Sequence, residues 1–205
     1  MRRVTLWCVL AGLAVGVGAG PAAGDITLAV RGPDDPVAID SFFDVFIEID
    51  GLLEGSEPSL GTFDLLLGFD PSVVAVANVT FGDPDFGDQL DLLGFGSPAY
   101  GIIGADNVNL VEVSLDDVWT LNTLQKADFQ LATVSFQALG MGTSPLVLLD
   151  TWLGDAGYAF GGEDAQELIP ADVLGAEVTV IPAPAAVVLA GLGLGLVPGL
   201  RRRLG

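Results

Sequence analysis

The highest density of carboxylates in the sequence lies in residues 82–91, where Asp83, Asp85, Asp88 and Asp91 follow one another in a glycine-containing stretch. Carboxylates spaced this closely can converge on Ca²⁺, a hard cation that takes about six to eight oxygen ligands. The spacing lacks the order of an EF-hand loop and its closing glutamate. The stretch therefore predicts either a calcium site or a solvated acidic loop. A second cluster of this kind consists of Asp155, Glu163 and Asp164.

Aromatic side chains form another candidate site, because a flat ring can stack on a sugar, as in carbohydrate-binding modules. The candidates are Trp119, Trp152 and Tyr158, with Tyr100 and Phe160 as further members of such a platform. The alternative is that these rings belong to a hydrophobic core, where aromatic side chains bury much of their area.

The residue types argue against catalysis. The sequence contains no histidine, and its one cysteine, Cys8, lies close to the first residue. Ser-His-Asp and Cys-His mechanisms and His-ligated metal sites are therefore excluded. A pair of carboxylates can hydrolyse a glycosidic bond, but among 27 acidic residues a suitable pair arises by chance. We expect a protein that is not an enzyme, with a glycan-active enzyme as the remote alternative.

The charge distribution separates the two ends from the middle. Between the terminal arginines the only basic residues are Arg31 and Lys126, whereas all 27 acidic residues lie in this part. Its formal charge is therefore −25. Nucleic acids are bound through Lys and Arg that neutralise phosphates. A nucleic-acid partner is therefore not expected.

Residues 1–24 have the organisation of a secretory signal peptide. Arg2 and Arg3 form the basic start, an apolar stretch follows, and small residues come next. Ala22 and Gly24 stand three residues and one residue before a cleavage site that precedes Asp25. The sequence thus predicts an exported protein whose remaining chain has no cysteine.

The C-terminal segment predicts a single transmembrane helix. Residues 183–200 contain no charge, and Arg201, Arg202 and Arg203 follow directly. Eighteen helical residues span about 27 Å, close to the roughly 30 Å hydrocarbon core of a bilayer. The arginines would stay cytoplasmic by the positive-inside rule, which leaves the middle of the chain outside that membrane.

Between the two ends, apolar and polar residues alternate with a period of two, which indicates β-strands with one buried face. Turn residues such as Asp70-Pro71-Ser72 separate these runs, so we expect an antiparallel β-sandwich. One short helix is expected after Ser114, which with Asp117 resembles a capping box, and Leu115, Val118 and Leu121 follow at helical spacing. The predicted core includes Phe43, Val45, Ile47, Phe63, Leu65, Leu67, Val134 and Phe136.

The C-terminal tail resembles a PEP-CTERM sorting signal of the variant type that reads Val-Pro-x-Pro-Ala. Ile181, Pro182, Ala183 and Pro184 occupy the motif, with Ile181 in place of its valine, and the apolar helix and Arg201 to Arg203 follow it. The resemblance implies processing by an exosortase-type membrane protease in a Gram-negative bacterium that makes exopolysaccharide. The protein would be anchored transiently in the inner membrane and then reach the cell surface or the extracellular matrix.

The middle of the chain resembles cohesin-like domains. The run Leu60–Val74, in which a strand ends in Phe-Asp-Pro, is similar to a strand junction of that family, and residues 108–115 and 129–136 are similar to later strands. The resemblance implies an all-β jelly-roll sandwich related to carbohydrate-binding modules. It implies binding of a partner and no catalysis.

These observations divide the chain into a signal peptide (1–24), a cohesin-like β-sandwich (25–181) and a sorting signal (182–205). The predicted function is that of an exported, non-enzymatic surface or matrix protein whose sandwich binds a protein or a polysaccharide. The alternative is a calcium-dependent adhesive protein of the exopolysaccharide matrix.

Overall fold

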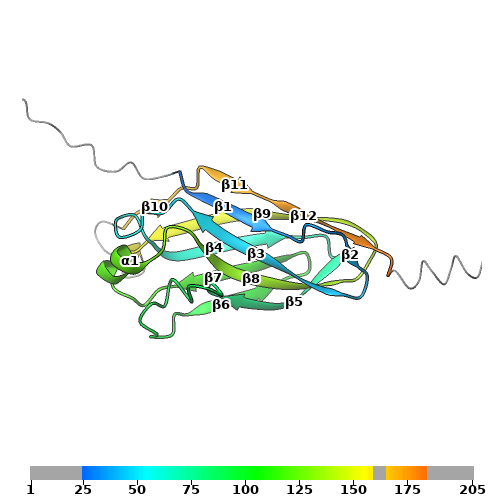
Figure 1. The fold of residues 1–205 in the computed structure, drawn as a ribbon, viewed down its shortest axis with the longest axis horizontal. Helices are drawn as coiled ribbons and strands as arrows, with labels where there is room; N and C mark the ends of the chain where they lie inside the picture. Colours follow the sequence, from blue (N-terminus) through cyan, green and yellow to red (C-terminus); the bar gives the residue numbers. More distant parts are fainter. Residues whose placement is uncertain (1–24, 159–164, 184–205) are drawn as a thin grey trace, which may run out of the picture.

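The computed structural model describes residues 25–158 and 165–183. They form two β-sheets packed face to face, with one short helix at one end of the sandwich (Figure 1). The expected all-β sandwich is confirmed. Within the described residues no helix is long and apolar enough to cross a membrane. The predicted signal peptide and the predicted C-terminal helix lie outside these residues, except for Ala183.

The first sheet has five strands in the order β11-β1-β3-β8-β5. Their bounds are β11 Asp172–Leu174, β1 Thr27–Arg31, β3 Phe42–Asp50, β8 Phe129–Ala138 and β5 Val74–Phe81. All neighbours pair antiparallel except β1 and β11, which are parallel.

The second sheet has seven strands in the order β2-β12-β9-β4-β7-β6, with β10 paired to β9 beside this path. Their bounds are β2 Val37–Ala38, β12 Ala176–Ile181, β9 Gly142–Asp155, β4 Leu60–Gly68, β7 Asn107–Val113, β6 Ala99–Ile103 and β10 Glu167–Leu168. Here β2 and β12 are parallel, and the remaining pairs are antiparallel.

The core between the sheets consists of the inward residues of each alternating strand. Of the predicted core residues, all are buried except Phe43, which is half-buried and packs against the core. Its ring stacks on Phe136 at a centroid distance of 5.7 Å, and Phe69 meets Phe136 edge-on at 5.3 Å. This aromatic group ties the end of β4 to β3 and β8.

The structure confirms the predicted turn at Asp70 but contradicts the predicted helix N-cap at Ser114. Asp70 ends β4 with an Asx turn, in which its Oδ1 accepts hydrogen bonds from the N–H and hydroxyl of Ser72. The helix α1 (Val118–Leu124) begins after Asp117, whose carboxylate accepts from the N–H of Thr120. Ser114 is therefore not the N-cap, because its hydroxyl donates to the carbonyl of Leu90 in the buried end of the sandwich.

Candidate functional site

The outer surface of the seven-stranded sheet carries apolar side chains that are exposed on β6 and partly buried on β7, β4 and β9. On the edge strand β6, Tyr100 and Ile102 are 59% and 62% exposed. The register aligns two rows of outward residues across these strands. We call these rows the apolar face; they are Tyr100-Val111-Asp64-Trp152 and Ile102-Asn109-Leu66-Asp150. Because neighbours in a row lie opposite each other on paired strands, the rows form one continuous surface.

One end of the apolar face is an aromatic pair. The rings of Trp152 and Tyr158 meet edge-on with centroids 4.7 Å apart. Gly154 makes room for this contact, since a Cβ at that position would lie 2.9 Å from the Cβ and ring of Tyr158. The structure thus brings together two of the three rings predicted to stack on a sugar.

The other predicted platform residues are placed differently. Trp119 lies on α1, 69% exposed, and no aromatic ring among the described residues pairs with it. Tyr100 occupies the opposite end of the row that contains Trp152, with β7 and β4 between them. Phe160 lies outside the described residues. The predicted platform is therefore reduced to the Trp152–Tyr158 pair.

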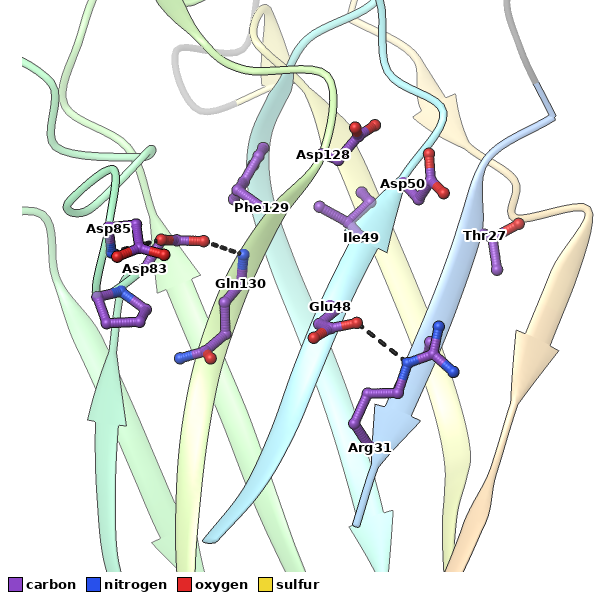
Figure 2. Close-up of a pocket in the computed structure, with 12 residues that line it drawn as sticks. Thr27, Arg31, Glu48, Ile49, Asp50, Asp83, Asp85, Asp128, Phe129 and Gln130 are labelled. Carbon is purple, nitrogen blue, oxygen red and sulfur yellow. Dashed lines mark hydrogen bonds and ion pairs between the residues drawn. The ribbon is translucent and has the colours of Figure 1, made fainter. Parts of the chain in front are cut away.

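The outer surface of the five-stranded sheet is mainly polar, although Phe42 on β3 is 66% exposed, and it has a hollow of about 350 Å³. Figure 2 shows Arg31 and Glu48 in this hollow, joined by an ion pair of 3.1 Å between Nε and Oε2. Asp50 and Asp128 lie above them. A hydrogen bond between these two carboxyl groups, together with burial, raises the pKa of Asp128. The hollow is an acidic environment whose one arginine is already paired.

The predicted calcium ligand Asp83 lines this hollow and caps main-chain groups. Its Oδ1 accepts from the N–H groups of Asp85 and Phe86 at 2.8 and 3.0 Å, and its Oδ2 accepts from the N–H of Gln130 at 2.8 Å. Burial acts to raise the pKa of Asp83, but these three donors hold it below its ordinary value. Asp83 therefore holds the turn of its own loop with Oδ1 and fixes that loop to β8 with Oδ2.

Two of the other predicted ligands also hold main-chain amides. Asp88 accepts from the N–H of Leu90, and both oxygens of Asp91 accept from the N–H of Gly96. Asp85 is exposed at the tip of the loop. As placed, no three acidic side chains of residues 25–158 and 165–183 converge on a point that would hold a metal ion. The calcium site at Asp83, Asp85, Asp88 and Asp91 stays a prediction.

The second acidic cluster is only partly described. Asp155 ends β9, and its Oδ1 is buried with no hydrogen-bond partner. Glu163 and Asp164 lie outside the described residues, so this cluster also stays a prediction.

A polar end of the core, which sequence reasoning missed, lies beneath residues 88–92. Glu112 is 1% exposed on the inner surface of β7, in line with the buried Val108 and Leu110. Asp116, just beyond the strand, is 0% exposed. The signal was present in the sequence, because Glu112 occupies an inward position of an alternating strand. We call Glu112, Asp88, Asp91 and Asp116 the buried acidic cluster.

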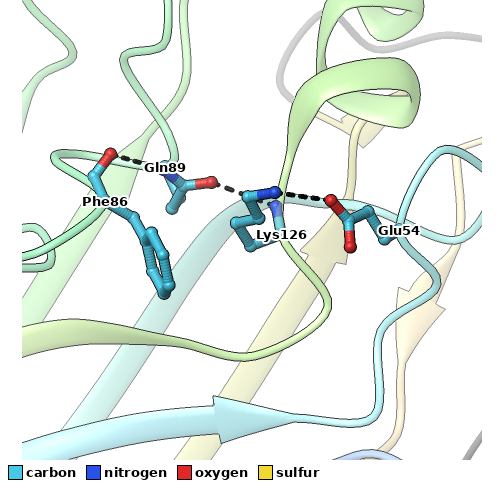
Figure 3. A network of polar contacts seen from close by, with 4 residues as sticks. All are labelled: Glu54, Phe86, Gln89 and Lys126. Carbon is cyan, nitrogen blue, oxygen red and sulfur yellow. Dashed lines mark hydrogen bonds and ion pairs between the residues drawn. The ribbon is translucent and has the colours of Figure 1, made fainter.

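Neutral side chains around this cluster have their hydrogen bonds satisfied. Gln125 bonds both main-chain groups of Leu60, and its Nε2 also donates to the carbonyl of Gln89. Figure 3 shows the Gln89 side chain between the carbonyl of Phe86 and the main-chain N–H of Lys126. These bonds hold the loop after β5 against the start of β8.

Two acids of the cluster, Glu112 and Asp116, in contrast, have raised pKa values. Burial first, and then the Asp88 and Asp91 carboxylates, raise the pKa of Glu112 to about 9. Burial also raises the pKa of Asp116, against the lowering effect of main-chain N–H donors from Leu92 and Leu93. The pKa of Glu112 is thus shifted far from its ordinary value, and Glu112 has no basic neighbour among the described residues.

Comparisons with known proteins identify the fold. No family model and no curated protein matches the sequence. Among solved structures, the type II cohesin–X–dockerin complex of Acetivibrio cellulolyticus has a chain that matches with a TM-score of 0.56 and 15% identity, over 77% of this chain and 99% of the other.

Two further structures agree. A type I cohesin–dockerin complex of Clostridium thermocellum matches with a TM-score of 0.54 and 12% identity, over 76% of this chain and 99% of the other. A cohesin module from a family 33 glycoside hydrolase of Clostridium perfringens matches with a TM-score of 0.52 and 14% identity, over 78% and 98%. The chain therefore has the fold of a cohesin module.

Proposed function

We propose that this chain is a non-enzymatic binding module that docks a partner protein on its apolar face. The observation that carries the proposal is the exposure of Tyr100 and Ile102 at the start of two aligned rows on the seven-stranded sheet. Aromatic and aliphatic side chains gathered on one exposed surface are typical of protein interfaces. The structural neighbours support a protein partner, because two of them are cohesins in complex with dockerin modules.

The chemistry of the face defines the partner. Asp64 and Asp150 lie within the apolar rows, and the middle of the chain carries a large negative charge. A complementary surface therefore presents apolar side chains with one or two Lys or Arg residues among them. Charge complementarity of this kind mainly speeds association and selects the partner, while the apolar contacts supply affinity.

The proposal is tested by comparing matched double substitutions on β6 and β5, which are edge strands of the two sheets. Capture from cell-surface extracts of a producing bacterium identifies the partner, whose affinity is then measured with purified protein. Tyr100→Asp and Ile102→Asp together should weaken binding at least about tenfold, because each buries a charge in the interface. Asn78→Asp and Thr80→Asp, at two exposed outward positions of β5, serve as the control. Equal binding by both double variants would exclude the apolar face.

A polysaccharide partner is the second candidate, favoured by the Trp152–Tyr158 pair. The exposed ring of Tyr158 and the partly buried ring of Trp152 together offer a surface for sugar rings. A glycan array and binding to native exopolysaccharide test this candidate. Trp152→Ala is the test variant, and Trp119→Ala is the control. Only the first substitution should reduce sugar binding if the pair is the site.

The route to the cell surface is proposed from the sequence. We infer export with removal of residues 1–24 and exosortase-type processing near Pro182 to Pro184, which would place the domain at the surface or in the matrix. Mass spectrometry of surface and medium fractions tests this route. Intact Met1 or Arg203 in those fractions would exclude it.

A further inference from the structure

The buried acidic cluster contains oxygen atoms that nothing in the described chain satisfies. Oε1 of Glu112 and Oδ1 of Asp116 are both buried without a hydrogen-bond partner, on side chains that are 1% and 0% exposed. Buried polar atoms of native proteins are nearly always paired, because an unmade hydrogen bond costs about 1–3 kcal/mol and more for a charged group. Two such atoms at one end of the core therefore indicate a missing ligand.

The described part of the chain has no unpaired side-chain cation to supply. Arg31 and Lys126 are the basic side chains of the described residues, and both are engaged elsewhere. Arg31 pairs with Glu48 on the outer surface of the five-stranded sheet, and Lys126 extends to Glu54 at 2.5 Å (Figure 3). Among the described residues, therefore, only a proton or an ion from solution can neutralise the buried cluster.

The carboxylates face one another across the junction of β7 and the loop. The Asp88 side chain lies within hydrogen-bonding reach of Glu112, and Asp91 is close enough to act on the same group. Asp91 also acts on Asp116, so one loop links both orphaned acids. The adjacent carbonyl of Leu90 is occupied, since it accepts from the hydroxyls of Ser97 and Ser114. Carboxylates brought this close repel unless a proton or a cation neutralises one of them.

We propose that Glu112 and Asp88 bind one divalent cation, best fitted by Ca²⁺, with Asp91 and Asp116 adding negative charge around it. Oxygen ligands from an irregular loop and a buried strand suit Ca²⁺, which accepts variable geometry, better than Mg²⁺, which requires a regular octahedron. Two carboxylates meet here, so water and main-chain carbonyls other than that of Leu90 would have to supply the rest of the shell. This site differs from the stretch predicted from sequence, because Asp83 and Asp85 are absent and Glu112 enters. It is independent of the apolar face and so goes beyond the proposed docking function.

The test measures thermal unfolding of the full chain after removal of metal with EDTA. Calcium at a hundredfold excess over its Kd should raise the Tm by about 5 °C or more, beyond the effect of NaCl at equal ionic strength. Calorimetric titration should give one ion per chain. MgCl₂ should produce a smaller shift than CaCl₂ at the same concentration.

Variants locate the ion. Glu112→Gln and Asp88→Asn should each abolish the calcium-specific shift, whereas Glu177→Gln, an exposed glutamate on β12, should retain it. Asp83→Asn with Asp85→Asn should lower the Tm but also retain the shift. Two results would overturn the proposal: no calcium-specific shift in the unmodified chain, which means that a proton alone neutralises the pair, or a full shift in both Glu112→Gln and Asp88→Asn. Partner binding by Glu112→Gln should be unchanged, which separates this site from the docking function.

Discussion

The two sheets of this sandwich distribute polar and apolar side chains in opposite ways. The five-stranded sheet is apolar inside, with Val45, Ile47 and Val134 fully buried. It is mainly polar outside, where Asp44 is bonded to Ser135 across β3 and β8 and Phe42 is an exposed exception. The seven-stranded sheet exposes Tyr100 and Ile102 and buries Glu112. A half-buried strand normally alternates apolar inside and polar outside, so deviations from this pattern mark positions kept for function. The seven-stranded sheet deviates on both of its surfaces, and each deviation leads to a binding proposal.

The largest expected effect tests the sheet that follows the ordinary pattern. Phe136→Ala removes a fully buried ring that contacts Phe43 and Phe69, and it should lower the free energy of unfolding by about 3–5 kcal/mol. Chemical denaturation measures this value. A loss below about 1 kcal/mol would mean that this sheet is not the stabilising half of the core.

The next effect sharpens the difference between the two outer surfaces. Tyr100→Asp with Ile102→Asp should weaken partner binding by about 2–3 kcal/mol, a factor of about 30 to 150. The same change should alter stability by less than about 1 kcal/mol, because both side chains are exposed. Titration calorimetry with the purified partner and denaturation of the free protein provide the two values.

A pH experiment addresses the inner surface of the seven-stranded sheet. The pKa of Glu112 rises from 4.5 to about 9 on folding, so the folded state keeps a proton that the unfolded state has lost. Stability in metal-free buffer should therefore fall as the pH rises through this window, by at most about 1.4 kcal/mol per pH unit from this group.

Glu112→Gln should reduce that pH dependence and raise stability at pH 8. Asp116 and Asp128 also have raised pKa values, so a smaller slope of the same sign should remain. Denaturation at pH 5 and pH 8 of the unmodified chain, Glu112→Gln and Glu177→Gln provides the comparison. An identical slope in all three proteins would show that Glu112 is not the group responsible.

The smallest effect returns to the polar outer surface. Asp44→Asn alters an exposed carboxylate that accepts from Ser135 at 2.6 Å. It should change the free energy of unfolding by no more than about 0.5 kcal/mol, as is usual for exposed polar contacts. The shift in Tm measures it, and a larger loss would show that this surface is more than a solvated exterior.

The alternation of single strands could be predicted from the sequence, whereas the relations between strands could not. Val45, Ile47, Leu65 and Leu67 were correctly predicted to be buried, because a period of two fixes which residues share a face. The resemblance at Phe69-Asp70-Pro71 led to the fold that the solved structures confirm.

What escaped prediction depends on contacts distant in sequence. The close spacing of Asp83 and Asp85 suggested that they share a calcium ion. Asp83 instead accepts a hydrogen bond from the N–H of Gln130, 47 residues away. Trp119 and Trp152 looked equivalent, but only Trp152 has an aromatic neighbour in the described chain. Which outer surface is apolar follows from the order of β9, β4, β7 and β6 in the sheet, and periodicity carries no information on that order.

The parallel pairing at the sheet margins has a mechanical consequence. β1 begins at one end of the sandwich and β12 ends at the other, and both run along its length (Figure 1). β1 pairs in parallel with β11, and β12 pairs in parallel with β2 while antiparallel to β9. Because sheet hydrogen bonds lie across the strands, tension applied between Thr27 and Ile181 shears many of them together instead of opening them one by one. A domain stretched between these points should therefore withstand more force than its equilibrium stability alone suggests.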